Sequence, residues 1–108
     1  MTVKQLADAL ELKEICMCED DRVVTGGYAG DLLSWVMGRA RSGDAWVTIM
    51  SNVNIVAVAT LADPACIILS EGVEADSDTV ARARSMGVNV LGSVKNTFEL
   101  CAEIAKLI

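Results

Sequence analysis

The sequence contains no histidine, only one proline, and only two tryptophans, one tyrosine and one phenylalanine. Histidine is the most frequent general acid or base in enzymes, and no serine or cysteine here stands beside an evident base. The motif H-E-x-x-H and a paired-carboxylate motif are also missing. We therefore predict that the chain has no catalytic residues, uses no cofactor and is not an enzyme.

Basic runs and targeting segments are absent as well. With a formal net charge of −6, the chain has no source for the counterion release that drives nucleic-acid binding. No cationic segment followed by an apolar one opens the chain, so we expect a cytoplasmic protein without a secretory signal. Residues 45–62 carry no charge, but Ser51, Asn52 and Asn54 interrupt the apolar run. We interpret this region as two buried elements and expect neither nucleic acid nor a membrane as partner.

Small and aliphatic residues make up most of the chain. The 108 residues are 53% hydrophobic but only 4% aromatic, so the core must consist of Ala, Val, Ile, Leu, Met and Cys. This length fits one domain, residues 1–108. So high an apolar share in a small domain indicates that another copy covers part of the surface, which predicts a C2 homodimer.

Local patterns predict helices that alternate with strands. Capping-box spacings occur at Thr2 with Gln5 and at Asn96 with Glu99, and Gly87 is placed to end a helix. The apolar run 54–62 fits a buried helix or one strand of a hairpin, and the surrounding alternation favours the helix. We expect helices at residues 2–10, 31–41, 54–62, 77–86 and from 96 onward, and strands near residues 14–18, 45–50, 65–70 and 88–91. This alternation predicts a three-layer α/β domain, with a mainly parallel sheet of four to five strands and helices on both faces.

The second of these helices bears on the predicted dimer. Its apolar residues fall on one helical face, which predicts that they point into the core: Leu32, Leu33, Val36, Met37 and Ala40. Trp35 and Trp46 are expected in the core too, and either one, if exposed beside Val36 or Met37, would mark a subunit interface.

The glycine-rich stretch "DRVVTGGYAGDLLSWV" precedes that helix and raises two readings, a phosphate cradle or a tight turn. In a parallel sheet, loops at the carboxyl ends of strands share one edge, where ligands bind against helix N-termini. We expect four loops there: Thr25-Gly26-Gly27-Tyr28, Ser51-Asn52-Val53-Asn54, Ser70-Glu71-Gly72 and Gly92-Ser93. Gly26 and Gly27 allow a ligand to approach the backbone closely.

Each candidate residue near these loops also has an ordinary structural reading. Asp31 can cap the helix itself and leave less room for an anion. Arg22 can bind a phosphate or pair with Asp20, Asp21 or Asp31. Tyr28 can stack on a ring or close a hydrophobic lid or an interface. The candidate ligand-binding residues are Arg22, Thr25, Gly26, Gly27, Tyr28, Asp31, Ser51, Asn52 and Asn54.

The four cysteines are Cys16, Cys18, Cys66 and Cys101. In a reducing compartment they are expected to be small buried hydrophobic residues rather than a disulfide framework. Cys16 and Cys18 would share one face of a strand, but no histidine is present to complete a mixed metal site. We therefore expect no bound metal, and keep a thiol-based redox or metal role for this pair as an alternative.

The stretch "DRVVTGGYAGDLLSWVM" resembles the DRTGG domain family, in particular short stand-alone members with the pattern D-R-x-V-T-G-G-Y-x-G-D-L-L. "NIVAVATLADPACIILSEG" and "GVNVLG" are similar to the same family, and the resemblance covers almost the whole chain. The chain departs from the name motif, because Val23 and Val24 separate Asp21-Arg22 from Thr25-Gly26-Gly27.

Related domains are accessory parts of HPr kinase/phosphorylase, phosphotransacetylase and pyrophosphatases with CBS modules. The resemblance therefore implies an α/β fold like the N-terminal domain of HPr kinase, and a regulatory or adaptor role without a catalytic centre. Our leading hypothesis is therefore a homodimer with a nucleotide or another small phosphorylated ligand at Gly26-Gly27, or with a protein partner such as a kinase or metabolic enzyme. The alternative is a small phosphotransfer-accessory enzyme that uses Asp20, Asp21 or Asp31.

Overall fold

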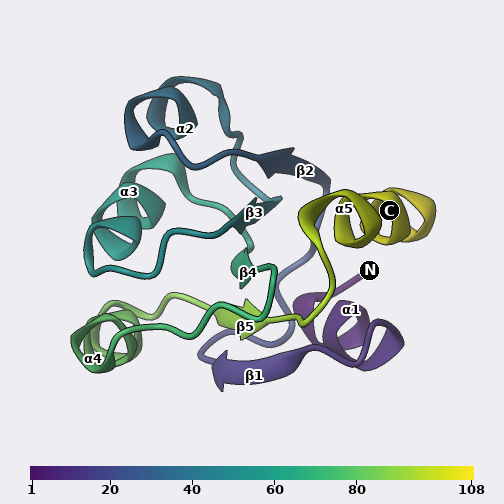
Figure 1. Ribbon diagram of the computed structural model, residues 1–108, viewed down its shortest axis with the longest axis horizontal. Coiled ribbons are helices and arrows are strands. Elements are labelled where there is room, and N and C mark those ends of the chain that lie inside the picture. Colours follow the sequence, from purple (N-terminus) through teal and green to yellow (C-terminus); the bar gives the residue numbers. More distant parts are fainter.

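The computed structural model describes residues 1–108 and contains a five-stranded mixed sheet between two layers of helices (Figure 1). The strands are β1 (Lys13–Cys16), β2 (Gly26–Ala29), β3 (Asp44–Thr48), β4 (Cys66–Leu69) and β5 (Val90–Gly92), in the order β1-β5-β4-β3-β2. The helices are α1 (Val3–Ala9), α2 (Leu33–Arg39), α3 (Asn54–Ala62), α4 (Ser77–Met86) and α5 (Thr97–Leu107). The predicted three-layer α/β fold is confirmed.

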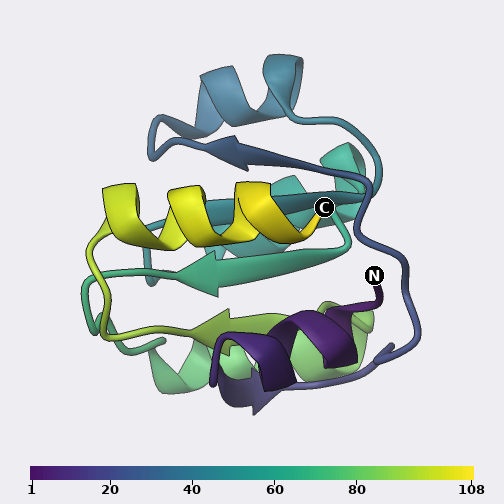
Figure 2. The same ribbon diagram turned by 90° about the vertical axis from the view of Figure 1, so that its right-hand side faces the viewer.

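The strand directions explain how the helices are distributed. Strands β2, β3, β4 and β5 are consecutive neighbours and run parallel, whereas β1 is antiparallel to β5 (Figure 2). Crossovers between parallel strands share one hand, so a chain that advances steadily across the sheet keeps its connecting helices on one face. Helices α2, α3 and α4 therefore cover one face, and α1 and α5 cover the other (Figure 1).

The two faces of the sheet bury separate apolar clusters. A cluster of 13 buried residues lies under α1 and α5, and a cluster of 11 lies under α2, α3 and α4. Every residue of β3 and β4 is buried, as expected for central parallel strands covered on both sides. Trp46 of β3 is the largest fully buried side chain and confirms the prediction that this tryptophan belongs to the core.

Helix ends follow the local signals in the sequence. The Thr2 hydroxyl accepts a hydrogen bond from the Gln5 N–H, and the Gln5 side chain accepts one from the Thr2 N–H, which completes the predicted capping box. Asn96 caps α5 by accepting from the Glu99 N–H. Gly87 ends α4 with φ +71°, a left-handed conformation that glycine adopts without steric cost.

Three predictions about the fold need correction. The loop expected at residues 25–28 is mostly the edge strand β2, bonded in parallel to β3. In α2 only Val36 is fully buried, and Met37 and the preceding Leu32, which were predicted to face the core, are exposed. Trp35, which was also expected in the core, is 53% exposed. A seven-residue helix at the end of a sheet has one side without a neighbour, so its apolar stripe is covered only in part.

None of the five helices combines the length and the hydropathy that a membrane-spanning helix requires. The longest, α5, has 11 residues. The uncharged segment 45–62 contains β3 without its first residue, a connecting loop and α3, so it forms two separate elements, as the sequence predicted.

Candidate functional site

The structure divides the predicted ligand-binding residues between the two ends of the sheet. Gly26 opens β2 opposite Asp44, the first residue of β3. Ser51 and Asn52 lie in the loop after β3, at the other end of the same strand, and Asn54 is the first residue of α3. The shared pocket expected between the glycine pair and the asparagine loop is therefore not formed, because a strand's length separates them.

The Thr25-Gly26-Gly27 segment has an architectural explanation. A Cβ on Gly26 would lie 2.7 Å from Oδ1 of Asp44, a buried carboxylate whose Oδ2 accepts from the Arg41 N–H at 2.8 Å. The Thr25 hydroxyl lies where a Cβ on Gly43 would be, and Gly43 has a φ of +87°, which favours glycine. The close approach of Asp44 disfavours any side chain at position 26. The same carboxylate repels an anion from the place expected for a phosphate.

Arg22 forms an ion pair, but not with the partners considered from the sequence. Its guanidinium donates to both carboxylate oxygens of Asp63, at 3.1 and 3.0 Å, and to the Asp63 carbonyl at 3.1 Å. The Ser42 hydroxyl donates to the same carboxylate at 2.6 Å. The hydrogen bonds from Arg22, and then those from Ser42, hold the pKa of Asp63 below its usual value. Arg22 thus ties the β1–β2 connection to the end of α3.

At the carboxyl ends of the strands, side-chain oxygens of the protein already accept hydrogen bonds from the backbone N–H groups. Asp31 accepts from the Thr48 hydroxyl at 2.8 Å and from the Ile49 N–H at 2.9 Å, so it fixes the loop after β3 rather than capping its own helix. Asn52 accepts from the Asn54 N–H. Glu71 accepts from the N–H of Thr97, the first residue of α5. These internal acceptors fill positions that an anionic ligand would need.

Tyr28 belongs to the sheet rather than to a mobile lid. It pairs with Trp46 across β2 and β3 and packs, half buried, against the cluster under α2 and α3. The Trp46 indole N–H donates to the Gly30 carbonyl at 2.9 Å, and the Tyr28 ring lies against Gly30. The glycine at position 30 leaves room for the ring.

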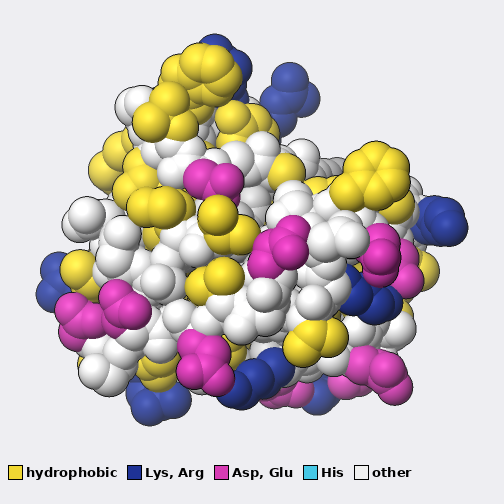
Figure 3. Space-filling view, viewed as in Figure 1, with side chains coloured by type: hydrophobic (Ala, Val, Ile, Leu, Met, Phe, Trp, Pro, Cys, Tyr) yellow, Lys and Arg dark blue, Asp and Glu magenta, His cyan; other side chains and the backbone are white.

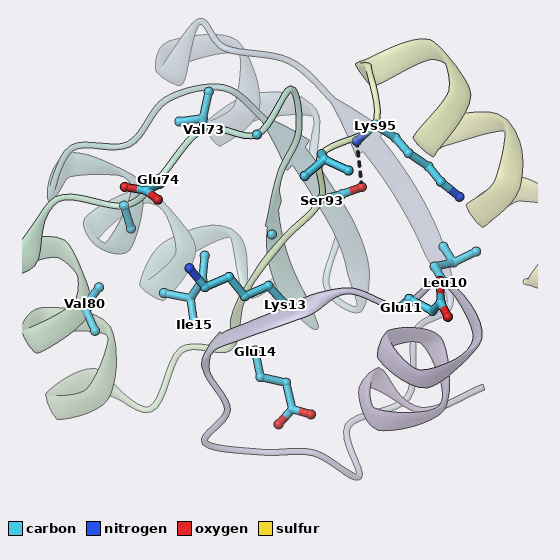
Figure 4. A pocket seen from close by; sticks show the side chains of 14 residues that line it. Leu10, Glu11, Lys13, Glu14, Ile15, Val73, Glu74, Val80, Ser93 and Lys95 are labelled. Carbon is cyan, nitrogen blue, oxygen red and sulfur yellow. Dashed lines mark hydrogen bonds between the residues drawn. The ribbon is translucent and has the colours of Figure 1, made fainter.

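The largest cavity lies beside the edge strand β1 and has a volume of about 550 Å³ (Figure 4). Its wall includes residues 72–75, which follow β4, and residues 92–95, which continue from β5. Lys13 and Ile15 reach into it from β1, whereas Glu14 points away (Figure 4) and pairs with Lys4. The volume lies in the range of small-molecule sites.

Lysines and carboxylates share this cavity. Lys95 is paired with Glu103, but Lys13 has no carboxylate within ion-pair distance. Glu11 and Glu74 also line the wall. The cavity can therefore offer one unpaired ammonium group to an anion. Gly92 and Ser93 were expected at this edge, but Lys13 was not, since its place depends on the antiparallel pairing of β1 with β5, for which the sequence has no local signal.

A second hollow follows the opposite edge of the sheet. This groove between β2 and α5 has a volume of about 250 Å³ and contains no charged side chain. Its lining residues are Gly27, Tyr28, Ala29, Ala45, Val47, Cys101, Ile104, Ala105 and Ile108. Above the same edge, Leu32 and Trp35 of the α2 region are 58% and 53% exposed.

The chain matches no family model and no curated protein. It does match solved structures. One contains the CBS and DRTGG domains of the regulatory region of Clostridium perfringens pyrophosphatase, complexed with the activator diadenosine tetraphosphate. The TM-score is 0.75 and the identity 13%, over 94% of this chain and 44% of that chain.

The two proteins share a fold. This agrees with the fold that the sequence resemblance implies, and membership of the DRTGG family stays a prediction. The chain spans less than half the length of the matched pyrophosphatase chain. The likeness therefore establishes the architecture, and the ligand named for the neighbour belongs to that protein.

Proposed function

We propose that this chain is a non-catalytic regulatory or adaptor module that works as a homodimer joined along strand β2. The observation that carries the proposal is the open β2 edge with its uncharged groove, in a chain whose net charge is −6. Two copies of an acidic protein repel each other, so self-association requires contact through a neutral surface. The fold shared with part of a regulatory region supports the role.

The two edges of the sheet differ in how they are protected. Strand β1 carries Lys13 and Glu14, and its register with β5 shifts between Glu14 and Cys16. Charges and irregular pairing are the usual means by which edge strands avoid pairing with other chains. Strand β2, Gly26–Ala29, has neither a charge nor a proline, and its pairing with β3 is regular. The β2 edge is thus the one suited to accept another strand.

Apolar side chains flank the β2 edge on both sides. On one side lie the exposed Leu32 and Trp35, and hydrophobic side chains gather over α2 in the space-filling view (Figure 3). Arg39 stacks on one face of the Trp35 ring, 3.8 Å from its centroid. On the other side, Ile104 and Ile108 line the groove. An antiparallel β2–β2 contact places these surfaces symmetrically, as a C2 interface requires.

The test places a charge on the edge. Ala29 is exposed on β2 and lines the groove, so Ala29→Glu puts two carboxylates into the proposed interface. We expect the parent protein to sediment as a dimer and Ala29→Glu as a monomer in analytical ultracentrifugation at micromolar concentration. Ala81→Glu, at an exposed position of α4, is the matched control and should remain dimeric. A monomeric parent, or an Ala29→Glu variant that stays dimeric, contradicts the proposal.

A second candidate function is binding of a nucleotide or another small phosphorylated ligand in the β1 cavity. It is favoured by the unpaired Lys13 in a volume of about 550 Å³, and the neighbour was solved with a nucleotide activator. A hydrogen bond to a charged group contributes about 1.5–3 kcal/mol.

The corresponding test is calorimetric titration with ATP, ADP, AMP and diadenosine tetraphosphate. Lys13→Ala should weaken binding by about tenfold or more, whereas Lys106→Ala near the end of α5 should leave it unchanged. Loss of binding in Thr25→Ala, with Lys13→Ala unaffected, would instead favour the glycine segment as the site. Absence of binding by all four nucleotides would remove nucleotides from the proposal.

A further inference from the structure

Two of the four cysteines have their sulfur atoms in contact. The Sγ atoms of Cys16 and Cys18 lie 3.4 Å apart. Cys16, the last residue of β1, is buried in the cluster under α2, α3 and α4, whereas Cys18 is exposed. Cys66 and Cys101 belong to the cluster on the opposite face of the sheet. Within one chain, Cys18 can therefore meet only Cys16.

A buried asparagine holds the backbone at this pair. The Asn89 side-chain oxygen accepts from the N–H groups of Cys18 and Glu19, both at 2.8 Å. Its amide nitrogen donates to the Glu19 carbonyl at 2.8 Å and to the Ala65 carbonyl at 3.0 Å. The Cys18 Sγ lies 3.9 Å from the Ala83 carbonyl of α4. Fixed backbone on both sides keeps the two thiols adjacent in the folded protein.

We propose that Cys16 and Cys18 form a reversible dithiol site, which a low-molecular-weight disulfide oxidises to an intramolecular bridge. An S–S bond is about 2.05 Å long, so the two sulfur atoms must approach by about 1.4 Å from the 3.4 Å seen here. Side-chain rotation about the Cα–Cβ bonds supplies a movement of this size. The site is separate from the β2 edge and from the β1 cavity, and it stands without the proposed dimer.

The exchange proceeds in two balanced steps. The exposed Cys18 loses its proton to solvent, and its thiolate attacks one sulfur of the small disulfide and releases one thiol after protonation. Cys16 then loses its proton, attacks the Cys18 sulfur of the mixed disulfide and releases the second thiol. The two cysteines are oxidised by two electrons, the small disulfide is reduced to two thiols, and excess small thiol reverses both steps.

The surroundings suit Cys16 as the second thiol to react. Burial and, after it, the contact with Cys18 raise the pKa of Cys16 to about 11, while Arg84 acts in the opposite direction. Cys16 therefore stays protonated at neutral pH, and the solvent-exposed Cys18 is the thiol that an incoming disulfide reaches first. A mixed disulfide at Cys18 removes the charge that Cys18 can carry, while the opposing effect of Arg84 remains, which favours the second attack.

The experiment uses the full chain in anaerobic glutathione buffers of increasing glutathione disulfide content, followed by acid quenching. Denaturation and alkylation should label four cysteines in the reduced protein and two fewer in the oxidised one. Intact mass should show the loss of two hydrogen atoms, and peptide mapping should place the bridge between Cys16 and Cys18. Dithiothreitol should restore all four labels.

Variants separate the proposed roles. Cys18→Ser should lose the bridge, and Cys16→Ala should stop at one glutathionyl group on Cys18, while Cys101→Ser should oxidise like the parent. Circular dichroism confirms that each variant is folded. A parent that keeps four alkylatable thiols under all conditions overturns the proposal, and so does a bridge that involves Cys101 or a second chain. A bridge that forms as readily in the urea-unfolded chain would show that the fold does not position the pair.

Discussion

The two adjacent glycines of β2 should respond in opposite ways to the same substitution. In Gly26→Ala the new methyl group would lie 2.7 Å from Oδ1 of Asp44, well inside van der Waals contact. Asp44 cannot move freely, because it is buried and bonded to the Arg41 N–H at 2.8 Å. In Gly27→Ala the nearest atom is the Ala45 carbonyl oxygen at 3.6 Å, an ordinary contact.

The magnitude follows from these distances. Overpacking of this kind costs about 1–3 kcal/mol, and replacing glycine by alanine at a compatible backbone position stabilises by about 0.4–1 kcal/mol. Gly26→Ala should therefore lower the free energy of unfolding by about 1–2 kcal/mol. This corresponds to a fall in Tm of about 5–15 °C for a domain of this size. Gly27→Ala should keep or slightly raise the parent value.

Urea unfolding followed by circular dichroism, at one protein concentration for all variants, measures the difference. The double variant Asp44→Asn/Gly26→Ala tests whether the cause is steric. Asparagine has nearly the same shape as aspartate, so removing the charge should restore little of the stability that Gly26→Ala loses. Equal stability of the two alanine variants would refute the argument that Asp44 dictates the glycine at position 26. A larger loss in Gly27→Ala would show that the β2 backbone requires glycine for a different reason.

Three further predictions concern the contacts around the sheet. Arg22 lowers the pKa of Asp63 in the folded state, so the ion pair stabilises the protein at pH values above the ordinary carboxyl pKa, and this contribution is lost as the pH falls through the lowered pKa. Asp63→Asn should therefore flatten the acid limb of the stability curve below the ordinary carboxyl pKa, and an unchanged limb contradicts the pairing. Asp31→Ala leaves the buried Thr48 hydroxyl without its acceptor and should cost about 1–3 kcal/mol by thermal unfolding, while helical circular dichroism stays constant; a loss of helical signal would show that Asp31 caps the helix after all. Trp46→Phe removes the indole N–H that binds a backbone carbonyl before α2 and should cost about 1–3 kcal/mol; a neutral effect in denaturant titration would exclude that bond as a stabilising contact.

The parts of the fold that depend on local signals could be predicted from the sequence. Thr2 with Gln5, and Asn96 with Glu99, define helix starts through bonds that span three residues. The ambiguous run 54–62 is helical, as the alternation of strands and helices favoured. Strands β3 and β4 were expected near residues 45–50 and 65–70, from short apolar runs rich in strand-forming residues.

The candidate site required information that no local pattern holds. The composition of residues 26–29 is that of a turn. They form a strand because they pair with β3, and the Asp44 side chain packs against Gly26. The partner of Arg22 lies 41 positions further along the chain. Lys13 enters the β1 cavity because β1 pairs antiparallel with β5.

The amino-acid sequence alone determined the α/β class, most element positions and the aliphatic core, because helix caps and hydrophobic periodicity act over a few residues. Tertiary structure decided which end of the sheet each glycine and asparagine occupies, which edge stays open and which cysteines meet. These outcomes depend on strand order and direction, set by packing between segments distant in the chain. The role of the Gly26-Gly27 motif could therefore be assigned only once its place in the sheet, beside Asp44, was known.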